Sequence, residues 1–319
     1  MKFRICPLLV WMLACPVVAH AYPERPIRLV VGFTPGGGAD VAARLVAQKL
    51  TETWRQTVVV DNRAGVGGNI AAEIVAKSNP DGYTLLLTSP GPVAINPSLM
   101  TRLPYNPRKD LAPITLVAFG PNVLVVPTAS PAASLTELIA LARSSANRLN
   151  YGSSGQGTTP HLSAELLKMM VKIEMVHVAY KGAGPAAIDL VAGRLDLMIV
   201  SAPTVLGQIR AQRLKALAVT TLARSSALPE VPTFNEAGLP GYEAVVWWGL
   251  LAPAGTPAAI IGKLHQAIAA ILQTADARSR IAADGAEVVG NTPKAFGEFM
   301  EKETIKWAGV IKAAGIKVD

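Results

Sequence analysis

Cysteine is almost absent from this 319-residue chain, and its two cysteines, Cys6 and Cys15, both lie within the first 21 residues. A chain that loses this segment can form no disulfide and no thiolate nucleophile. Aromatic residues make up only 5% of the sequence, and no dense lysine or arginine block occurs. The chain therefore has too few aromatic side chains to stack on bases and no basic patch to bind a phosphate backbone. We expect no nucleic-acid partner. Half of the residues are hydrophobic and 16% are charged, which excludes a disordered chain.

Residues that could carry catalysis are also few. After the first segment the histidines are His161, His177 and His265, with no pair four residues apart. The acidic residues show no paired spacing, and a zinc site needs clustered ligands. We therefore expect no metal, no cofactor and no enzymatic activity.

The N-terminal segment has the pattern of an export signal. Lys2 and Arg4 precede an apolar stretch, Ile5–Val18, and Ala19–Ala21 supplies a small-x-small cleavage site. The apolar stretch is shorter than the roughly 18 residues of a membrane span. We expect residues 1–21 to be a signal peptide that is cleaved after Ala21, with lipidation at Cys15 as the alternative.

The mature chain keeps a positive formal charge. Loss of Lys2 and Arg4 lowers the net charge from +8 to +6. A positive cleft concentrates anions, so this balance favours a small anionic ligand.

From Pro26 onward, short apolar runs alternate with amphipathic segments. The apolar runs do not alternate with polar residues, which predicts buried parallel strands with helices on both faces of the sheet. In the first helix, Val41, Leu45 and Val46 are predicted to face inward. The first series comprises strands at residues 27–33, 58–60 and 84–88 and helices at 39–50 and 69–77.

A second series of the same kind follows, so we predict an α/β protein with two domains and a ligand cleft between them. Two extended segments cross between the domains and form the hinge. The second series comprises strands at 123–127, 149–151, 175–178, 197–200, 214–219 and 245–251 and helices at 134–144, 160–171, 185–192, 258–272 and 293–314. The predicted divisions are 22–125 for the first part of domain one, 126–247 for domain two and 248–319 for the return to domain one.

The strongest local motif is the glycine-rich loop Phe33–Asp40, which joins the first strand to the first helix. Three consecutive glycines let the backbone approach a ligand, and the N–H groups of a helix start attract anions. The motif lacks the Lys-Ser/Thr pair of a Walker loop and the third glycine of a dinucleotide fingerprint. We interpret it as a receptor for a carboxylate or phosphate oxygen; the alternative is a plain tight turn.

A second glycine-rich loop, Tyr151–His161, follows a short strand in the other half of the chain. Ser153, Ser154 and Thr158 supply hydroxyl donors, and Thr159 with a following proline marks a helix start. These hydroxyls either bind an anion or only cap the helix. Ser89 lies at the carboxyl end of the third strand, where open α/β sheets bind ligands.

Taken together, these motifs are similar to those of the Bug receptors, the extracytoplasmic solute-binding proteins of tripartite tricarboxylate transporters. The motifs that carry the resemblance are Pro26–Val31, the Phe33–Asp40 loop, Asn79–Thr84, Tyr180–Gly182 and Trp248–Pro253. The resemblance implies a periplasmic two-domain Venus flytrap of the periplasmic-binding-protein class. We expect the protein to be a monomer. The resemblance also implies ligand contacts from Phe33, Thr34, Gly36, Gly37, Asp40 and Ser89 on one side and from Ser153, Ser154, Gly157 and Thr158 on the other.

The resulting functional hypothesis is a receptor that captures a small carboxylate, such as a di- or tricarboxylate, an amino acid or an aromatic acid, and delivers it to membrane permease subunits. One alternative is a sensor subunit that signals to a membrane histidine kinase. Another is an exported hydrolase with Ser153 or Ser154 as nucleophile and His161 as base.

Overall fold

The computed structural model describes residues 22–144, 148–283 and 285–316. The predicted signal peptide, both cysteines and the predicted cleavage site lie outside these ranges. Across the ranges that are described, no helix combines the length and apolar character that a membrane crossing requires.

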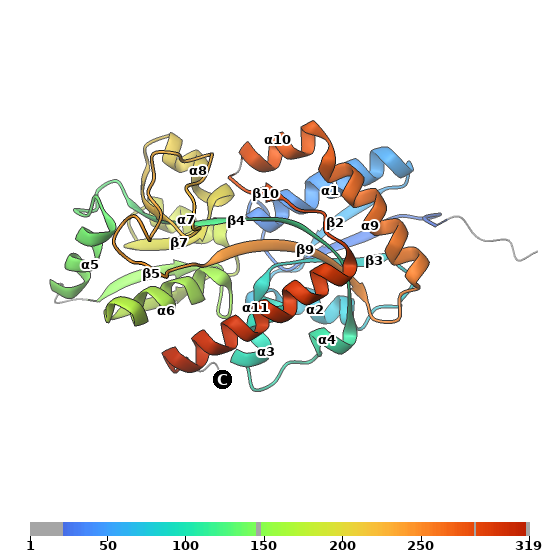
Figure 1. The fold of residues 1–319 in the computed structure, drawn as a ribbon, viewed down its shortest axis with the longest axis horizontal. Helices are drawn as coiled ribbons and strands as arrows, with labels where there is room; N and C mark the ends of the chain where they lie inside the picture. The colour runs from blue at the N-terminus through green and yellow to red at the C-terminus, as the bar shows by residue number, and fades with distance from the viewer. Residues whose placement is uncertain (1–21, 145–147, 284, 317–319) are drawn as a thin grey trace, which may run out of the picture.

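The described strands form one mixed sheet along the long axis of the molecule (Figure 1). Its order is β2-β1-β3-β9-β4-β7-β5-β6, and β8 and β10 also pair with β4. The pairs β1–β2, β1–β3, β5–β6 and β5–β7 are parallel, as predicted, whereas every pair made by β4 or β9 is antiparallel. The strands are β1 Ile27–Val31, β2 Val58–Asn62, β3 Thr84–Thr88, β4 Leu111–Pro127, β5 Leu149–Ser153, β6 Met175–Ala179, β7 Leu197–Ser201, β8 Leu214–Val219, β9 Val245–Pro253 and β10 Glu287–Val288.

Strand β4 joins the two halves of the sheet. Its residues 111–121 pair with β9 and β10, and its residues 122–127 pair with β7 and β8. We call β1–β3, β9 and β10 with their helices the first half, and β5–β8 with theirs the second half. The sequence predicted only 123–127 of this strand and missed the part that contains Pro113 and Pro121. The ladder accommodates Pro113 by a register shift beside it.

The helices occupy both faces of the sheet (Figure 1). The larger predicted helices are confirmed to within a few residues, but α8 and α10 were missed. Val41 is 38% exposed, so its predicted inward orientation is wrong. The helices are α1 Gly38–Trp54, α2 Asn69–Ala76, α3 Asn96–Leu99, α4 Pro107–Asp110, α5 Leu135–Ser144, α6 Thr159–Val171, α7 Ala183–Val191, α8 Ala202–Arg210, α9 Ala258–Gln273, α10 Ala275–Ala283 and α11 Pro293–Ala314, with short turns at Val66–Gly68 and Gly91–Ile95.

The apolar core differs between the two faces of the sheet. On the face of α11, one cluster runs through both halves and includes Leu86, Tyr151 and Trp307. Helix α11 passes beneath both halves in Figure 1 and packs against α6. On the other face the core is divided into one cluster around α1 and another around α7 and α8. The continuous core ties the halves together, and the divided face leaves room for a site between them.

Candidate functional site

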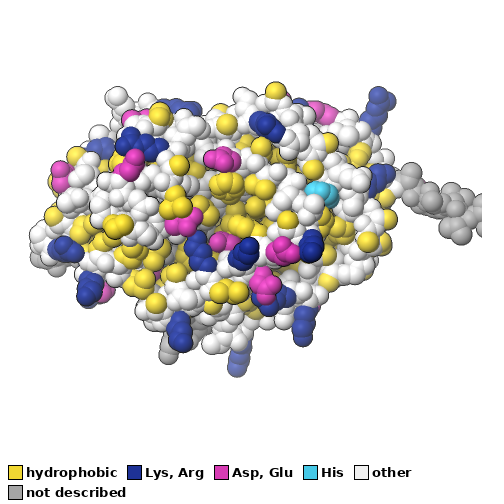
Figure 2. Space-filling model, in the orientation of Figure 1, with side chains coloured by type: hydrophobic (Ala, Val, Ile, Leu, Met, Phe, Trp, Pro, Cys, Tyr) yellow, Lys and Arg dark blue, Asp and Glu magenta, His cyan; other side chains and the backbone are white. Residues whose placement is uncertain are grey.

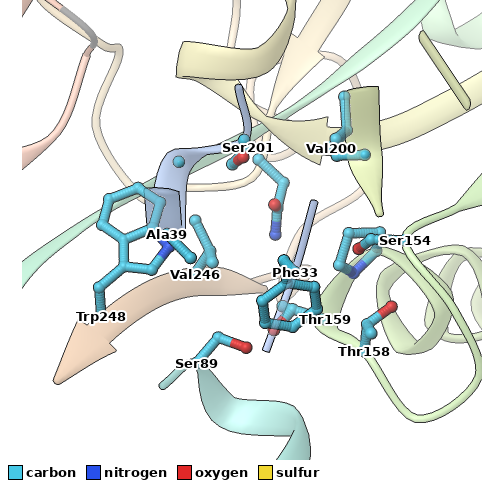
Figure 3. Close-up of a pocket in the computed structure, with 15 residues that line it drawn as sticks. Phe33, Ala39, Ser89, Ser154, Thr158, Thr159, Val200, Ser201, Val246 and Trp248 are labelled. Atoms are coloured by element: carbon cyan, nitrogen blue, oxygen red, sulfur yellow. The ribbon is translucent and has the colours of Figure 1, made fainter. Parts of the chain in front are cut away.

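A small cavity lies between the two halves (Figure 3). Its volume of about 40 Å³ is room for about three water molecules. Within the described part of the chain, no charged side chain lines it. Its walls combine hydroxyl groups, one carboxamide and apolar side chains. The lining residues are Phe33, Gly37, Gly38, Ala39, Ser89, Asn122, Ser154, Thr158, Thr159, Pro160, Ala183, Val200, Ser201, Val246 and Trp248.

Four helices begin at the wall of this cavity. Helix α1 begins at Gly38, α6 at Thr159, α7 at Ala183 and α8 at Ala202, directly after the lining residue Ser201. In the structure as described, no side chain at the four N-cap positions caps the first turn of its helix. The first N–H groups of an α-helix have no partner inside the helix, and the helix dipole places partial positive charge there. The cavity is therefore electropositive without a lysine or arginine in its wall.

Two lining side chains carry polar atoms that are buried without a hydrogen-bond partner among the described residues. These atoms are Asn122 Oδ1 and Thr159 Oγ1, in residues that are at most 1% exposed. The two donor nitrogens of Asn122 are already used. Its backbone N–H donates to Thr220 Oγ1 (2.9 Å), and its side-chain Nδ2 donates to the Ala244 carbonyl (2.9 Å). Buried polar atoms are rarely left unpaired in proteins, so their presence in a cavity wall indicates a place for a polar ligand or water.

Five of the sequence-predicted residues lie in the cavity wall, and the other five lie in the same loops but outside the wall. The structure brings the two predicted loops to the same cavity from opposite halves. The lining residues among those predicted are Phe33, Gly37, Ser89, Ser154 and Thr158. The predicted residues outside the lining are Thr34, Gly36, Asp40, Ser153 and Gly157.

Asp40 supports the first loop from behind. Its carboxylate accepts hydrogen bonds from the Gly36 amide (3.0 Å), Arg44 Nε (2.9 Å) and Asn62 Nδ2 (3.0 Å). Asn62 also donates to the Phe33 carbonyl (2.9 Å). Burial alone would raise the pKa of Asp40, but these hydrogen bonds and the positive charge of Arg44 outweigh it and hold the pKa below its ordinary value. The ionised carboxylate therefore fixes the loop that presents the start of α1.

A stack of neutral rings supports the second loop. His177 lies between Tyr151 and His161, with ring centroids 4.9 and 4.2 Å away. Ser153 Oγ lies 2.6 Å from His177 Nε2, and the Gly157 amide donates to His161 Nδ1 (3.2 Å). Burial, followed by nearby positive charge, lowers the pKa of His161 to about 4. Burial and the neighbouring His161 lower the pKa of His177 to about 3. Both rings are neutral near pH 7 and hold the loop by hydrogen bonds and stacking.

This arrangement bears on the hydrolase alternative. Ser153 is fully buried, its Oγ accepts from the Gly155 amide (3.1 Å), and it does not line the cavity. Ser154 does line the cavity, but His161, the predicted base, accepts from the backbone of Gly157. Neither serine is paired with an imidazole in a way that exposes an activated nucleophile to the cavity.

Glycines form the contact between the two halves beside the cavity. A Cβ atom on Gly67 would collide with the Gln156 carbonyl of the other half, and one on Gly157 would collide with Asn96 Oδ1. At the start of α7, a Cβ on Gly182 would collide with Thr34 Oγ1 of the first half. The halves therefore meet backbone to backbone, and only residues without side chains permit this distance.

The sequence interpretation missed the contributions of β4, β9 and α8. The start of α8, Ser201-Ala202-Pro203, repeats the hydroxyl-x-proline pattern of Thr158-Thr159-Pro160 after a buried strand and could have been found on that signal. Asn122 is a polar residue inside a long apolar run, which is a weaker signal. Trp248 belongs to a motif of the family resemblance, but nothing in the sequence indicated that it lines the cavity, because that position depends on how β9 crosses between the halves.

Comparison with known proteins agrees with this geometry. Residues 42–316 match the model of the tripartite tricarboxylate transporter family receptor. Protein BugT of Bordetella pertussis (strain Tohama I) is 40% identical over 307 residues, which cover 96% of this chain and 94% of BugT.

Two solved structures from Rhodopseudomonas palustris are similar over nearly their whole length. Rpa4515 with adipate is 40% identical with a TM-score of 0.91, over 93% of this chain and 99% of that one. MatC with bound malate is 33% identical with a TM-score of 0.87, over 91% of this chain and 100% of that one. The fold and the resemblance predicted from the sequence are thereby confirmed. The chain belongs to the tripartite tricarboxylate transporter receptor family.

Proposed function

We propose that this protein is a periplasmic receptor that captures a small carboxylate between its two halves and delivers it to membrane permease subunits, without chemical turnover. The observation that carries the proposal is the convergence of four uncapped helix starts on one cavity. The adipate and malate bound to the two R. palustris proteins support the same ligand class.

Electrostatics favour an acid held by neutral donors. A carboxylate that accepts backbone N–H and hydroxyl hydrogen bonds gains about 1.5–3 kcal/mol per bond. The donors come from both halves, with Ser154 and Thr159 on one side and the start of α1 on the other, whereas the Thr158 hydroxyl donates to the Gly155 carbonyl (2.7 Å). On the face shown in Figure 2, lysine and arginine side chains are interspersed with acidic ones rather than gathered in one patch. Recognition therefore rests on the cavity.

Capture couples to closure of the two halves. The ligand bridges helix starts that belong to different halves, so its full set of hydrogen bonds forms only when the halves meet. The glycine contacts at Gly67, Gly157 and Gly182 allow that approach. The closed form is then the state that a permease can distinguish from the empty receptor.

Export and delivery rest on the sequence and the family. The signal-peptide pattern of residues 1–21 supports export of the mature chain, and the family match to a receptor of tripartite tricarboxylate transporters supports delivery to a permease. A receptor of this kind needs no catalytic residue, which agrees with the hydrogen bonds that already occupy Ser153 and His161.

Calorimetry of residues 22–319 with a panel of dicarboxylates, tricarboxylates, amino acids and aromatic acids tests the proposal. We expect at least one acid to bind with 1:1 stoichiometry and its neutral amide to bind at least ten-fold more weakly, because the amide lacks the charge. Absence of binding across the panel, or equal binding of acid and amide, would refute it.

A further inference from the structure

A second cavity lies directly behind the first, between α1 and α10. Its volume of about 260 Å³ greatly exceeds that of the ligand cavity. We call it the annex. Most of its wall is apolar, and Arg44, Gln48 and Arg280 are the larger polar side chains of its lining. The annex is lined by Gly38, Val41, Ala42, Arg44, Leu45, Gln48, Ala118, Pro203, Trp248, Arg280, Ile281 and Ala286.

Only two residues, Gly38 and Trp248, line both cavities within the described structure. Trp248 is 3% exposed and packs so closely on α1 that a Cβ on Gly38 would collide with its indole ring. The ring therefore cannot move toward α1 without displacing the backbone of that helix. In Figure 3, Trp248 closes the side of the ligand cavity opposite Ser154 and Thr158.

We infer that Trp248 is the residue that sets the maximum length of the ligand, by separating the ligand cavity from an apolar annex that fits the tail of a longer acid. The inference rests on the proposed function, because it concerns the acid held at the helix starts. With the indole in place, the far end of an acid held in the ligand cavity meets the ring of Trp248 instead of the annex, so the length of the acid is limited. With a smaller side chain, the two cavities join and a longer acid fits.

The chemistry of the annex indicates an apolar tail. Arg44 is already bonded to Asp40 and Asn62, and Arg280 to Asp276 and Gln48. Both guanidinium groups are about half exposed at the rim, so the inner wall offers mainly aliphatic contacts. Each methylene that leaves water for such a wall strengthens binding by about four-fold.

The test is a chain-length series of straight mono- and dicarboxylic acids, measured by calorimetry on the protein and on Trp248→Leu and Trp248→Phe. We expect the protein's affinity to fall at least ten-fold once the chain outgrows the ligand cavity. In Trp248→Leu that fall should shift to longer chains, and the longest acids should gain at least ten-fold. Trp248→Phe should lie between the two and remains informative if the leucine variant does not fold.

Leu45→Ala is the matched control, because Leu45 lines the annex but not the ligand cavity. This variant enlarges the annex and leaves the indole in place, so its length profile should equal that of the unaltered protein. A folded Trp248 variant with an unchanged profile would overturn the inference while the proposed function stands. An unaltered protein that binds long acids as tightly as short ones would overturn it too. Failure of all acids to bind would refute the proposed function itself.

Discussion

The two loops that meet at the cavity perform the same task with different supports. The first, Phe33–Asp40, depends on an ionised carboxylate, Asp40, that is bonded to a half-exposed arginine. The second, Ser153–Thr159, depends on two neutral imidazoles and a tyrosine stacked inside the second half. Each presents a helix start to the ligand. The comparison shows that a site can be electropositive while the groups behind it are anionic in one half and uncharged in the other, and it predicts that the halves fail under different conditions.

The largest expected effect separates glycines in the two loops. Gly36 and Gly157 both have positive φ, at 88° and 69°, but only a Cβ on Gly157 would meet another residue, Asn96 of the first half. Gly157→Ala should therefore prevent full closure and weaken ligand binding by roughly a hundred-fold. In the closed state the added methyl group strains the backbone at positive φ and collides with Asn96, so the halves can no longer meet there. Calorimetry and small-angle scattering with saturating ligand measure the affinity and the closure.

Gly36→Ala is the control for this prediction. It carries the backbone strain of a positive φ, about 1 kcal/mol, without a collision. Adding Asn96→Ala to Gly157→Ala removes the colliding oxygen and should recover part of the affinity. Equal losses in the two glycine variants would show that strain in the loops, and not contact between the halves, controls binding.

The second effect is a difference in pH response. The pKa of His161 is about 4 in the folded chain, against an ordinary value of 6.5. As pH falls, the unfolded chain binds a proton first, so stability is complete above about 6.5 and is lost toward pH 4 by up to about 3 kcal/mol for this group. Asp40, whose pKa is lowered, keeps its contribution until the pH falls below the ordinary range of a carboxyl group. Near pH 5 the second loop should therefore loosen while the first holds.

Thermal melting and hydrogen exchange between pH 7 and pH 4 measure this difference. Amides around residues 153–158 should lose protection before those around 34–38. In His161→Gln the uncharged amide can still accept from the Gly157 N–H, so the loss of stability with pH should become shallower. Simultaneous loss of protection in both loops would contradict the comparison.

The sequence predicted most of the fold because local pattern and environment agree there. Buried strands without alternation and helices with clear starts were found to within a few residues, as in Thr84–Thr88 and Leu214–Val219. The wrong or missing predictions share one cause: contacts between segments that are distant in the sequence decided the local structure. Prolines at 113 and 121 indicate a break locally, yet β4 continues because β9 pairs along it. Val41 fits the helical periodicity but faces the annex, whose existence depends on α10.

The site was predictable only where glycine-rich loops present backbone N–H groups to the ligand. Glycine and hydroxyl residues after a strand identified both loops, and five of the ten predicted residues line the cavity. The sequence could not separate a residue in the wall, such as Ser154, from one directly behind it, such as Ser153, because both lie in the same loop. It also could not place Trp248, since strand pairing between distant segments determines that position.

The third effect tests the charged support of the first loop. Asp40→Asn keeps the size of the side chain but removes the negative charge that holds Arg44. It also replaces one of the two accepting oxygens of Asp40 by an NH₂ group that cannot accept. We expect a loss of about 1–2 kcal/mol in the free energy of unfolding and a several-fold weaker ligand affinity. Arg44→Gln leaves the hydrogen bonds that Asp40 accepts from Gly36 and Asn62 intact. It should lower the free energy of unfolding by less than about 1 kcal/mol, because Arg44 is more than half exposed. Urea unfolding compares the two variants, and a larger loss for Arg44→Gln would place the support outside Asp40.

The smallest effect uses two adjacent serines as each other's control. Ser154 lines the cavity, whereas Ser153 is bonded to His177 and Gly155 behind it. Ser154→Ala removes one donor to the ligand, so affinity should fall about three- to ten-fold with little change in the melting temperature. Ser153→Ala leaves the buried Gly155 amide without its acceptor, so melting should shift by several degrees while affinity changes less. The opposite pattern would mean that the second loop turns its other face to the ligand, and the stacked rings would then belong to the binding surface rather than to its support.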